Sequence, residues 1–184
     1  MANFYSDVIA RDPRFHSTKR ICDLALLEPV TRKSVEAIIE DAAALGILLM
    51  PFETYRSQER QQELFAQGAS KLRAVGVHHY GLACDIVKVV GGEPSWKGDF
   101  SFLGHLAQNH GLIWGGDWGA PNHPHTFVDA VHVQRCTVAM QPALFRGTWY
   151  PNDQYDPSST PERTLLLAKA PKAAVGNVAK AAKA

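Results

Sequence analysis

The sequence predicts an α+β fold built as a single domain. Amphipathic stretches with helical spacing and short apolar runs of strand length follow one another without a regular strand–helix–strand repeat. With 184 residues, 46% of them hydrophobic and 20% charged, the chain is long enough for one well-buried core and too short for two ordinary domains. We therefore expect one domain over residues 1–160, with its main motifs in 52–134, and a separate tail over 161–184.

The first half of the domain is expected to place a strand between two helices. Thr31 is a candidate N-cap for a helix whose apolar residues recur at intervals of three and four, and Gly46 is placed to end it. Residues 47–55 form a predicted buried strand that delivers Arg56 at its end, and Ser57 is able to cap the next helix.

The second half is expected to combine strands, loops and one helix. A strand begins at about Leu82 and continues to Val90. The elements expected after it are a turn at 91–94, a helix capped by Asp99, a short strand at 112–114, a surface loop at 115–124 and a strand at 127–133.

Composition argues against several classes of protein. Because no run of about 18 apolar residues occurs, no transmembrane helix is expected. The N-terminus lacks a positive region followed by an apolar one, so no ordinary secretory signal is expected and synthesis in a reducing cytoplasm is predicted. Cys22, Cys84 and Cys136 are odd in number and widely spread, which argues against a disulfide framework and against a cysteine metal site.

Charge is unevenly placed along the chain. The net charge of the whole chain is +1. Four of the 19 Lys and Arg residues lie after Arg163, whereas all 18 acidic residues lie in 1–163, so this part of the chain has 15 basic and 18 acidic residues and is mildly acidic. An acidic body without a basic stripe disfavours nucleic-acid binding. The Lys- and Ala-rich tail is expected to be disordered, and its charge to attract anionic polymers or lipid.

A histidine and a carboxylate seven positions apart, joined by a second histidine from a distant segment, form the ligand pattern of a catalytic zinc site. We predict His78, Asp85 and His132 as the ligands of one Zn²⁺ per chain, because three protein ligands leave a fourth position open for water. The alternative is that the histidines lie on the surface and Asp85 caps a turn. The paired pattern favours the metal site.

The spacing requires a bend between the first two ligands. Side chains alternate faces along a strand, so His78 and Asp85 would point in opposite directions if one straight strand joined them. Gly81 is the residue that can form this bend. The same alternation directs Cys84 into apolar packing and makes it a poor ligand.

Asp129 lies three residues before His132 and is the acid tied by sequence to the ligand set. It is the candidate general base, although the alternative role of orienting a histidine ligand stays open. Because residues three apart on a straight strand face opposite ways, Asp129 is expected at a strand start or a bulge.

Several short motifs together extend the pattern over residues 52–134. His78, Gly81, Ala83, Asp85, Asp129 and His132 match the signature Ser-x-His-x-x-Gly-x-Ala-x-Asp followed by an acid three residues before the last His, while Gly76 stands in the Ser position. The resemblance extends upstream to Tyr55-Arg56-Ser57 and downstream of Asp85 to Trp114-Gly115-Gly116-Asp117-Trp118. In these motifs the chain resembles the zinc D,D/L,D-peptidases of bacterial cell walls, which include D-alanyl-D-alanine carboxypeptidases and phage L-alanyl-D-glutamate endolysins.

This resemblance implies a small antiparallel sheet flanked by helices, as in hedgehog and D,D-peptidase domains. It also implies that Arg56 donates to the carbonyl oxygen that gains charge during amide attack, although an Arg in this position is otherwise commonly a surface ion-pair partner. Ser57, Asp117 and Trp118 are the candidate substrate-binding residues. Trp114 is equally well explained as core.

The function that the resemblance implies is hydrolysis of an amide bond in peptidoglycan stem peptides, in first place as an L-alanyl-D-glutamate endopeptidase. The alternatives are a D-alanyl-D-alanine carboxypeptidase and, in another class, an inactive zinc-containing protein that binds the wall or is structural. The presence of Asp129 and Arg56 favours an enzyme. A monomer is expected, acting on the wall after export or lysis, with the tail as a contact to anionic wall or membrane surfaces.

Overall fold

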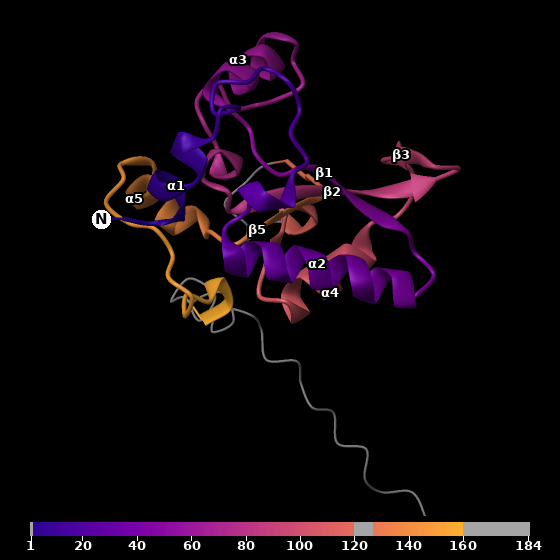
Figure 1. The fold of residues 1–184 in the computed structure, drawn as a ribbon. Coiled ribbons are helices and arrows are strands. Elements are labelled where there is room, and N and C mark those ends of the chain that lie inside the picture. Colours follow the sequence, from indigo (N-terminus) through magenta and orange to yellow (C-terminus); the bar gives the residue numbers. More distant parts are fainter. Residues whose placement is uncertain (1, 120–126, 160–184) are drawn as a thin grey trace, which may run out of the picture.

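A computed structural model describes residues 2–119 and 127–159 (Figure 1). Its centre is a five-stranded antiparallel sheet in the order β1-β2-β5-β4, with β3 paired to β2. The α+β class and the antiparallel sheet are therefore confirmed. The tail at 161–184 and the second half of the loop expected at 115–124 lie outside the described residues, and the domain boundary at residue 160 stays a prediction.

The strands are β1 Leu49–Glu53, β2 Ala83–Val90, β3 Glu93–Ser95, β4 Ile113–Trp114 and β5 His132–Gln134. The helices are α1 Phe4–Asp7, α2 Pro29–Ala44, α3 Gln58–Ala66, α4 Ser101–Asn109 and α5 Gln141–Phe145. A short 3-10 helix at Val77–Tyr80 precedes β2. Within the described residues, no helix combines the length and the apolar character that crossing a membrane requires.

Helices α2 and α4 lie side by side against one face of the sheet (Figure 1). Their apolar stripes pack with Cys84 and Ile86 of β2 in the main core. Because side chains alternate along a strand, Asp85 points to the opposite face of the sheet, which these helices leave uncovered. Cys84 is fully buried, as predicted, and burial raises the pKa of its thiol well above the ordinary value.

The start of α2 differs from the prediction. Thr31 is not the N-cap, because the helix begins at Pro29 and the carboxylate of Glu28 caps it. The backbone N–H and the hydroxyl of Thr31 both donate to Glu28 Oε2, at 2.9 and 2.8 Å. Proline is well suited to the first helical position, and the buried Glu28 lies 3.1 Å from Arg135 Nη1, which balances its charge.

The next two predictions differ from the structure in their ranges. The expected turn is present at Gly91 and Gly92, but the range 91–94 also contains the start of β3, in which Pro94 pairs with Val89 at an edge of the sheet where proline is tolerated. The strand expected over 127–133 begins only at His132, because residues before it form a turn. Asp99 accepts the backbone N–H of Ser101 at 2.8 Å and so helps to start α4, although Phe100 is the N-cap residue.

The segment before α2, whose role the sequence did not predict, packs behind the 3-10 helix. Ile9, Ile21 and Leu26 form a buried cluster with Tyr55, and Ile21 pairs with Tyr55 as an isolated β-bridge. The backbone N–H of Glu28 donates to the carbonyl oxygen of Gly81 at 2.9 Å. This segment therefore supports the loop that leads into β2.

Candidate metal centre

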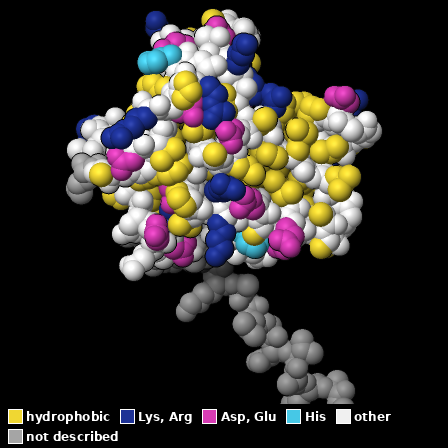
Figure 2. Space-filling model, viewed as in Figure 1, with side chains coloured by type: hydrophobic (Ala, Val, Ile, Leu, Met, Phe, Trp, Pro, Cys, Tyr) yellow, Lys and Arg dark blue, Asp and Glu magenta, His cyan; other side chains and the backbone are white. Residues whose placement is uncertain are grey.

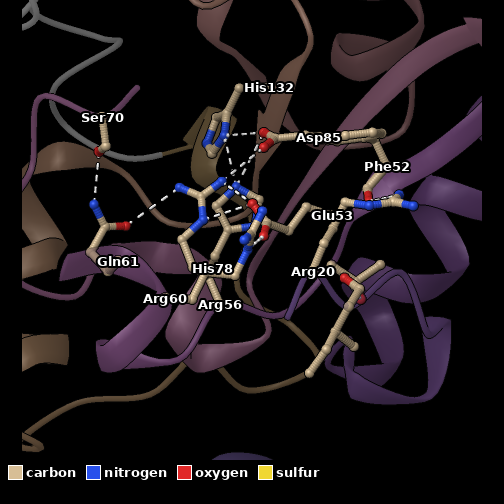
Figure 3. A network of polar contacts seen from close by, with 12 residues as sticks. Arg20, Phe52, Glu53, Arg56, Arg60, Gln61, Ser70, His78, Asp85 and His132 are labelled. Atoms are coloured by element: carbon tan, nitrogen blue, oxygen red, sulfur yellow. Dashed lines mark hydrogen bonds and ion pairs between the residues drawn. The ribbon is translucent and has the colours of Figure 1, made fainter. Parts of the chain in front are cut away.

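Three side chains from separate elements meet on the uncovered face of the sheet (Figure 3). His78 comes from the 3-10 helix, Asp85 from β2 and His132 from β5. His78 Nε2 lies 3.2 Å from Asp85 Oδ1 and 3.2 Å from His132 Nδ1, and His132 Nδ1 lies 3.1 Å from Asp85 Oδ1. The structure thus brings together all three residues that the sequence predicted as ligands.

Local backbone geometry explains how distant residues converge. Gly81 ends the 3-10 helix with a φ of 68°, in the left-handed region, and turns the chain into β2. A Cβ at this position would lie 2.6 Å from the carbonyl oxygen of Leu26, so a larger residue would push the loop away from the N-terminal segment. Asp85 and His132 are direct partners in the β2–β5 register.

The donor set fits a tetrahedral zinc ion. Ligands placed 2.0–2.2 Å from a tetrahedral metal are separated from each other by roughly 3.3 Å, close to the spacing of these three donor atoms. Nε2 of His132 lies 2.9 Å from Oε1 of Gln134, which only accepts. In its neutral form His132 therefore carries the hydrogen on Nε2 and directs the lone pair of Nδ1 into the cluster.

The two histidines keep Asp85 ionised. Burial alone would raise the pKa of Asp85, but the charges and hydrogen bonds of His78 and His132 outweigh burial and hold this pKa well below its ordinary value. Burial lowers the pKa of His132, and its contacts with Asp85 outweigh that effect and raise it. A carboxylate that stays charged at neutral pH is the form that binds a metal.

Arg56 lies directly beside the cluster. Its Nη2 donates to Asp85 Oδ2 at 3.1 Å, and its Nε and Nη2 both donate to Glu53 Oε2. Arg60 also bonds Glu53, so this buried carboxylate is held by two guanidinium groups. Arg56 is therefore anchored within the site, in contrast to the alternative of an exposed surface ion pair.

Asp129 lies in the turn that leads into β5. Its carbonyl oxygen accepts the N–H of His132 at 3.2 Å, and its own N–H donates to the carbonyl oxygen of Gly115 at 3.0 Å. Glycine is required at 115 because a Cβ there would come within 2.5 Å of the Asp129 carbonyl oxygen. Burial raises the pKa of the Asp129 carboxyl despite the opposing attraction of His132, and the nearby charge of Asp85 raises it further.

The three candidate substrate-binding residues have different surroundings. Trp118 is buried, with its ring centroid 5.0 Å from that of His132, whereas the Asp117 side chain is exposed. Ser57 is 1% exposed, donates to the carbonyl oxygen of Ser17 and accepts the N–H of Arg60 as the cap of α3. The capping prediction for Ser57 is confirmed. Both hydrogen bonds of the Ser57 hydroxyl are made with the protein backbone, so they do not support a contact between this hydroxyl and the substrate.

Sequence reasoning missed three residues that support the site. Gln134 follows His132 by two positions on β5 and so faces the same side, which is the signal that could have found it. Glu53 precedes Arg56 by three residues at the end of β1. His79 is buried, and its Nε2 lies 3.0 Å from the hydroxyl oxygen of Tyr5.

Comparisons with known proteins agree with this geometry. A family model of the M15 peptidases, described as D-alanyl-D-alanine carboxypeptidase, matches residues 70–135, which include the three candidate ligands and Asp129. The chain is 29% identical over 134 residues to the peptidoglycan L-alanyl-D-glutamate endopeptidase CwlK of Bacillus subtilis, a match that covers 60% of this chain and 80% of that relative.

A second relative is the L-alanyl-D-glutamate peptidase of Listeria phage A118, 27% identical over 124 residues. That match covers 65% of this chain and 42% of the phage protein, so the chain spans less than half of it. The crystal structure of the Serratia marcescens L-Ala D-Glu endopeptidase ChiX has the same fold, with a TM-score of 0.51 and 23% identity over 69% of this chain and 96% of ChiX.

Proposed function

The chain belongs to the M15-like family of bacterial cell-wall peptidases, and on this premise we propose that it is a zinc peptidase that cleaves the L-alanyl-D-glutamate bond of peptidoglycan stem peptides. The observation that carries the proposal is the cluster of His78, Asp85 and His132, whose ligand atoms lie within 4.8 Å of one another. The choice of bond is supported by the activities named for the Bacillus and phage relatives.

We propose that His78, Asp85 and His132 hold one zinc ion. When bound, zinc polarises the substrate carbonyl and lowers the pKa of a coordinated water to about 7. The protein residues around the cluster then supply the remaining chemistry, which is proton transfer and stabilisation of the developing negative charge.

Asp129 is proposed as the general base. Burial, with the nearby charge of Asp85, raises the pKa of this half-buried aspartate, which makes its carboxylate a stronger proton acceptor than an exposed one. It would take the proton of the attacking water and deliver it to the leaving amine. Trp118, packed near His132, is proposed to contact the peptide on this side of the cluster.

Arg56 is proposed to stabilise the carbonyl oxygen as it gains negative charge. Its Nε and Nη2 donate to Glu53 and Asp85, and within residues 2–119 and 127–159 its Nη1 makes one long contact, of 3.4 Å, with Gln61 Oε1. The guanidinium is therefore fixed in place while Nη1 retains hydrogen-bonding capacity. A donor fixed before the reaction costs no reorganisation at the moment of charge development.

The second candidate is cleavage of D-alanyl-D-alanine, which the description of the matching family model favours. One experiment separates the two activities. Zinc-loaded protein is incubated with a muropeptide that carries a pentapeptide stem, and the products are identified by mass spectrometry. Release of the peptide that begins with D-glutamate supports the endopeptidase, release of free D-alanine supports the carboxypeptidase, and no cleavage supports an inactive wall-binding protein.

A further inference from the structure

We propose that Trp96 forms a sugar-binding subsite beside the metal centre, which recognises the glycan end of the stem peptide. This inference rests on the proposed function and extends it, because it makes attachment of the peptide to a sugar part of substrate recognition. Its basis is a contact between two aromatic rings that reach across the central strand.

The two rings come from opposite edges of β2. Lys88 pairs with Leu49 of β1 and also with Ser95 of β3, and a strand residue has two pairing partners only when they lie on its two different edges. Phe52 of β1 and Trp96, directly after β3, nevertheless lie with ring centroids 4.6 Å apart and ring planes at 82°. The rings therefore meet above one face of β2.

That face is the one that carries the metal centre. Neither ring belongs to the core cluster on the helix-covered face, which includes Leu49, Cys84 and Ile86. Val87 points to the same side as Asp85, away from α2 and α4, and is nevertheless fully buried. Because Ser95 pairs with Lys88, Trp96 lies across from Val87, which is two residues, or about 7 Å, along β2 from Asp85.

Arg20 contacts both the ring and the backbone of Phe52. The guanidinium of Arg20 lies 4.2 Å from the centroid of the Phe52 ring, and its Nη1 donates to the Phe52 carbonyl oxygen at 2.7 Å. Figure 3 places this pair beside Glu53 and Asp85. Trp96 itself is 49% exposed. A large ring that is supported on one side and open on the other offers contact area at low entropic cost.

The end of the molecule that holds β3 is broadly apolar. Figure 2 shows hydrophobic side chains gathered over the part of the surface where β2 and β3 lie, and Leu45, Leu48 and Val90 at this end are each more than 60% exposed. Trp96 lies on the Asp85 side of β2, because its neighbour Ser95 pairs with Lys88, whose ammonium group lies over the rings of Phe100 and Phe102 at α4.

The chemistry of the proposed substrate identifies the occupant as a sugar. In a stem peptide the L-alanine is joined through a lactyl group to a pyranose ring, so one amino acid and one lactyl unit separate the reacting carbonyl from the sugar. Two such units span about 7 Å when extended, which equals the separation along β2 between Asp85 and the ring pair. The C–H face of a pyranose is apolar and packs on an indole ring, as apolar groups do.

The test compares two substrates that differ only in the sugar. One is the disaccharide tripeptide, and the other is the N-lactoyl tripeptide, which keeps the same amide and the same scissile bond. Zinc-loaded wild type, Trp96→Ala and Trp96→Phe are assayed on both by kcat/KM, with thermal melting as the check on folding. Val90→Ala is the matched control, because Val90 is 62% exposed in the same hairpin and, two residues from Lys88 on β2, faces the side opposite to the metal centre.

We expect Trp96→Ala to lower kcat/KM for the disaccharide substrate by about threefold to tenfold, the range of one aromatic contact, and to leave the lactoyl peptide within about twofold of wild type. Trp96→Phe should retain part of the difference, and Val90→Ala should change neither substrate. An equal loss on both substrates, or no loss on either, overturns the subsite while leaving the proposed function intact. If wild type cleaves neither substrate, the proposed function fails and the subsite fails with it.

Discussion

Arg56 and Asp85 form an ion pair in which Arg56 Nη2 donates to Asp85 Oδ2 at 3.1 Å, while the other oxygen, Oδ1, faces both histidines. The two oxygens of one carboxylate thus serve two different groups. Arg56 fixes the rotation of the Asp85 carboxylate, so that Oδ1 is presented to the centre. The proposed metal ligand set and the proposed positive donor, Arg56, are thus linked through a single side chain.

Metal content tests the ligand set. Purified protein should contain about one zinc per chain, and His132→Ala should lose most of it, because only two protein ligands remain. Metal analysis after dialysis gives the stoichiometry, and circular dichroism checks the fold. Gln108→Ala, at an exposed position on α4, is a control that should keep full zinc. Full zinc in both His78→Ala and His132→Ala would disprove the site.

Asp129→Asn separates metal binding from chemistry. The amide is nearly the same size as the carboxyl group and keeps the turn bonds of the backbone, so zinc content and melting temperature should stay unchanged. Peptide hydrolysis should fall by at least about a hundredfold, the scale of a lost general base. Steady-state kinetics on a defined muropeptide provides the measurement. A loss of only a few-fold would mean that another group accepts the proton.

Glu53→Gln tests whether Arg56 must be anchored. The substitution keeps the shape of the side chain but removes the charge that holds Arg56 and Arg60. We expect kcat to fall by about tenfold or more with zinc retained, because a preorganised donor loses its fixed position. Kinetics and metal analysis on the same sample decide the result. Glu36→Gln, which affects only an exposed pair with Arg32, serves as the control and should behave like wild type.

The N-terminal segment provides a pH-dependent contribution to stability. A hydrogen bond from Arg14 lowers the pKa of Asp12 against the opposing effect of burial, and the backbone N–H of Ala25 together with Arg14 lowers that of Asp23. Lowered carboxyl pKa values stabilise the fold at neutral pH, and this stabilisation is lost as pH falls below about 4, the ordinary pKa of aspartate. Arg14→Gln should therefore lower the melting temperature at pH 7 but have a smaller effect near pH 3.

That comparison uses melting curves of wild type and Arg14→Gln at both pH values. Both proteins lose other acid-sensitive interactions equally, so only the difference between them reports on Arg14. A difference that stays constant from pH 7 to pH 3 would show that Arg14 stabilises the segment through packing alone.

The basic tail is tested by truncation. We propose that residues 164–184, which carry four lysines and no acid, attract the protein to anionic wall polymers or membrane lipid. Deletion should leave cleavage of a small soluble muropeptide unchanged and reduce sedimentation with walls or anionic vesicles at low salt. The difference should disappear at about 1 M salt, where the screening length is about 3 Å. Equal sedimentation of both proteins at low salt would exclude an anchoring role.

Local rules were sufficient for the elements around the first two ligands. The need for a bend at Gly81, a strand from about Leu82 and a buried Cys84 all follow from alternation along one strand, and all are present. Ser57 was likewise identified as a cap because its hydroxyl acts on a backbone N–H only three residues away.

Features that depend on distant residues were not predictable in this way. Glu28, in place of Thr31, caps α2 because Arg135, remote in the sequence, offsets the burial of its charge. Asp129 lies outside β5 because its N–H is bonded to Gly115 across the site. The contact between Phe52 and Trp96 depends on the order of strands in the sheet, which no short stretch of sequence specifies.

The hydrogen bond from the Glu28 N–H to the Gly81 carbonyl oxygen has a consequence for the design of shortened proteins. All three candidate ligands lie within residues 70–135, yet the bend between the first two is held from outside that range, by Glu28 and by contact with Leu26. A fragment restricted to 70–135 would also lack β1, α2 and Glu53, together with five of the thirteen buried residues of the main core. Expression of the family-matched region alone should therefore yield an insoluble or unfolded peptide, and the smallest useful crystallisation target must retain the N-terminal segment.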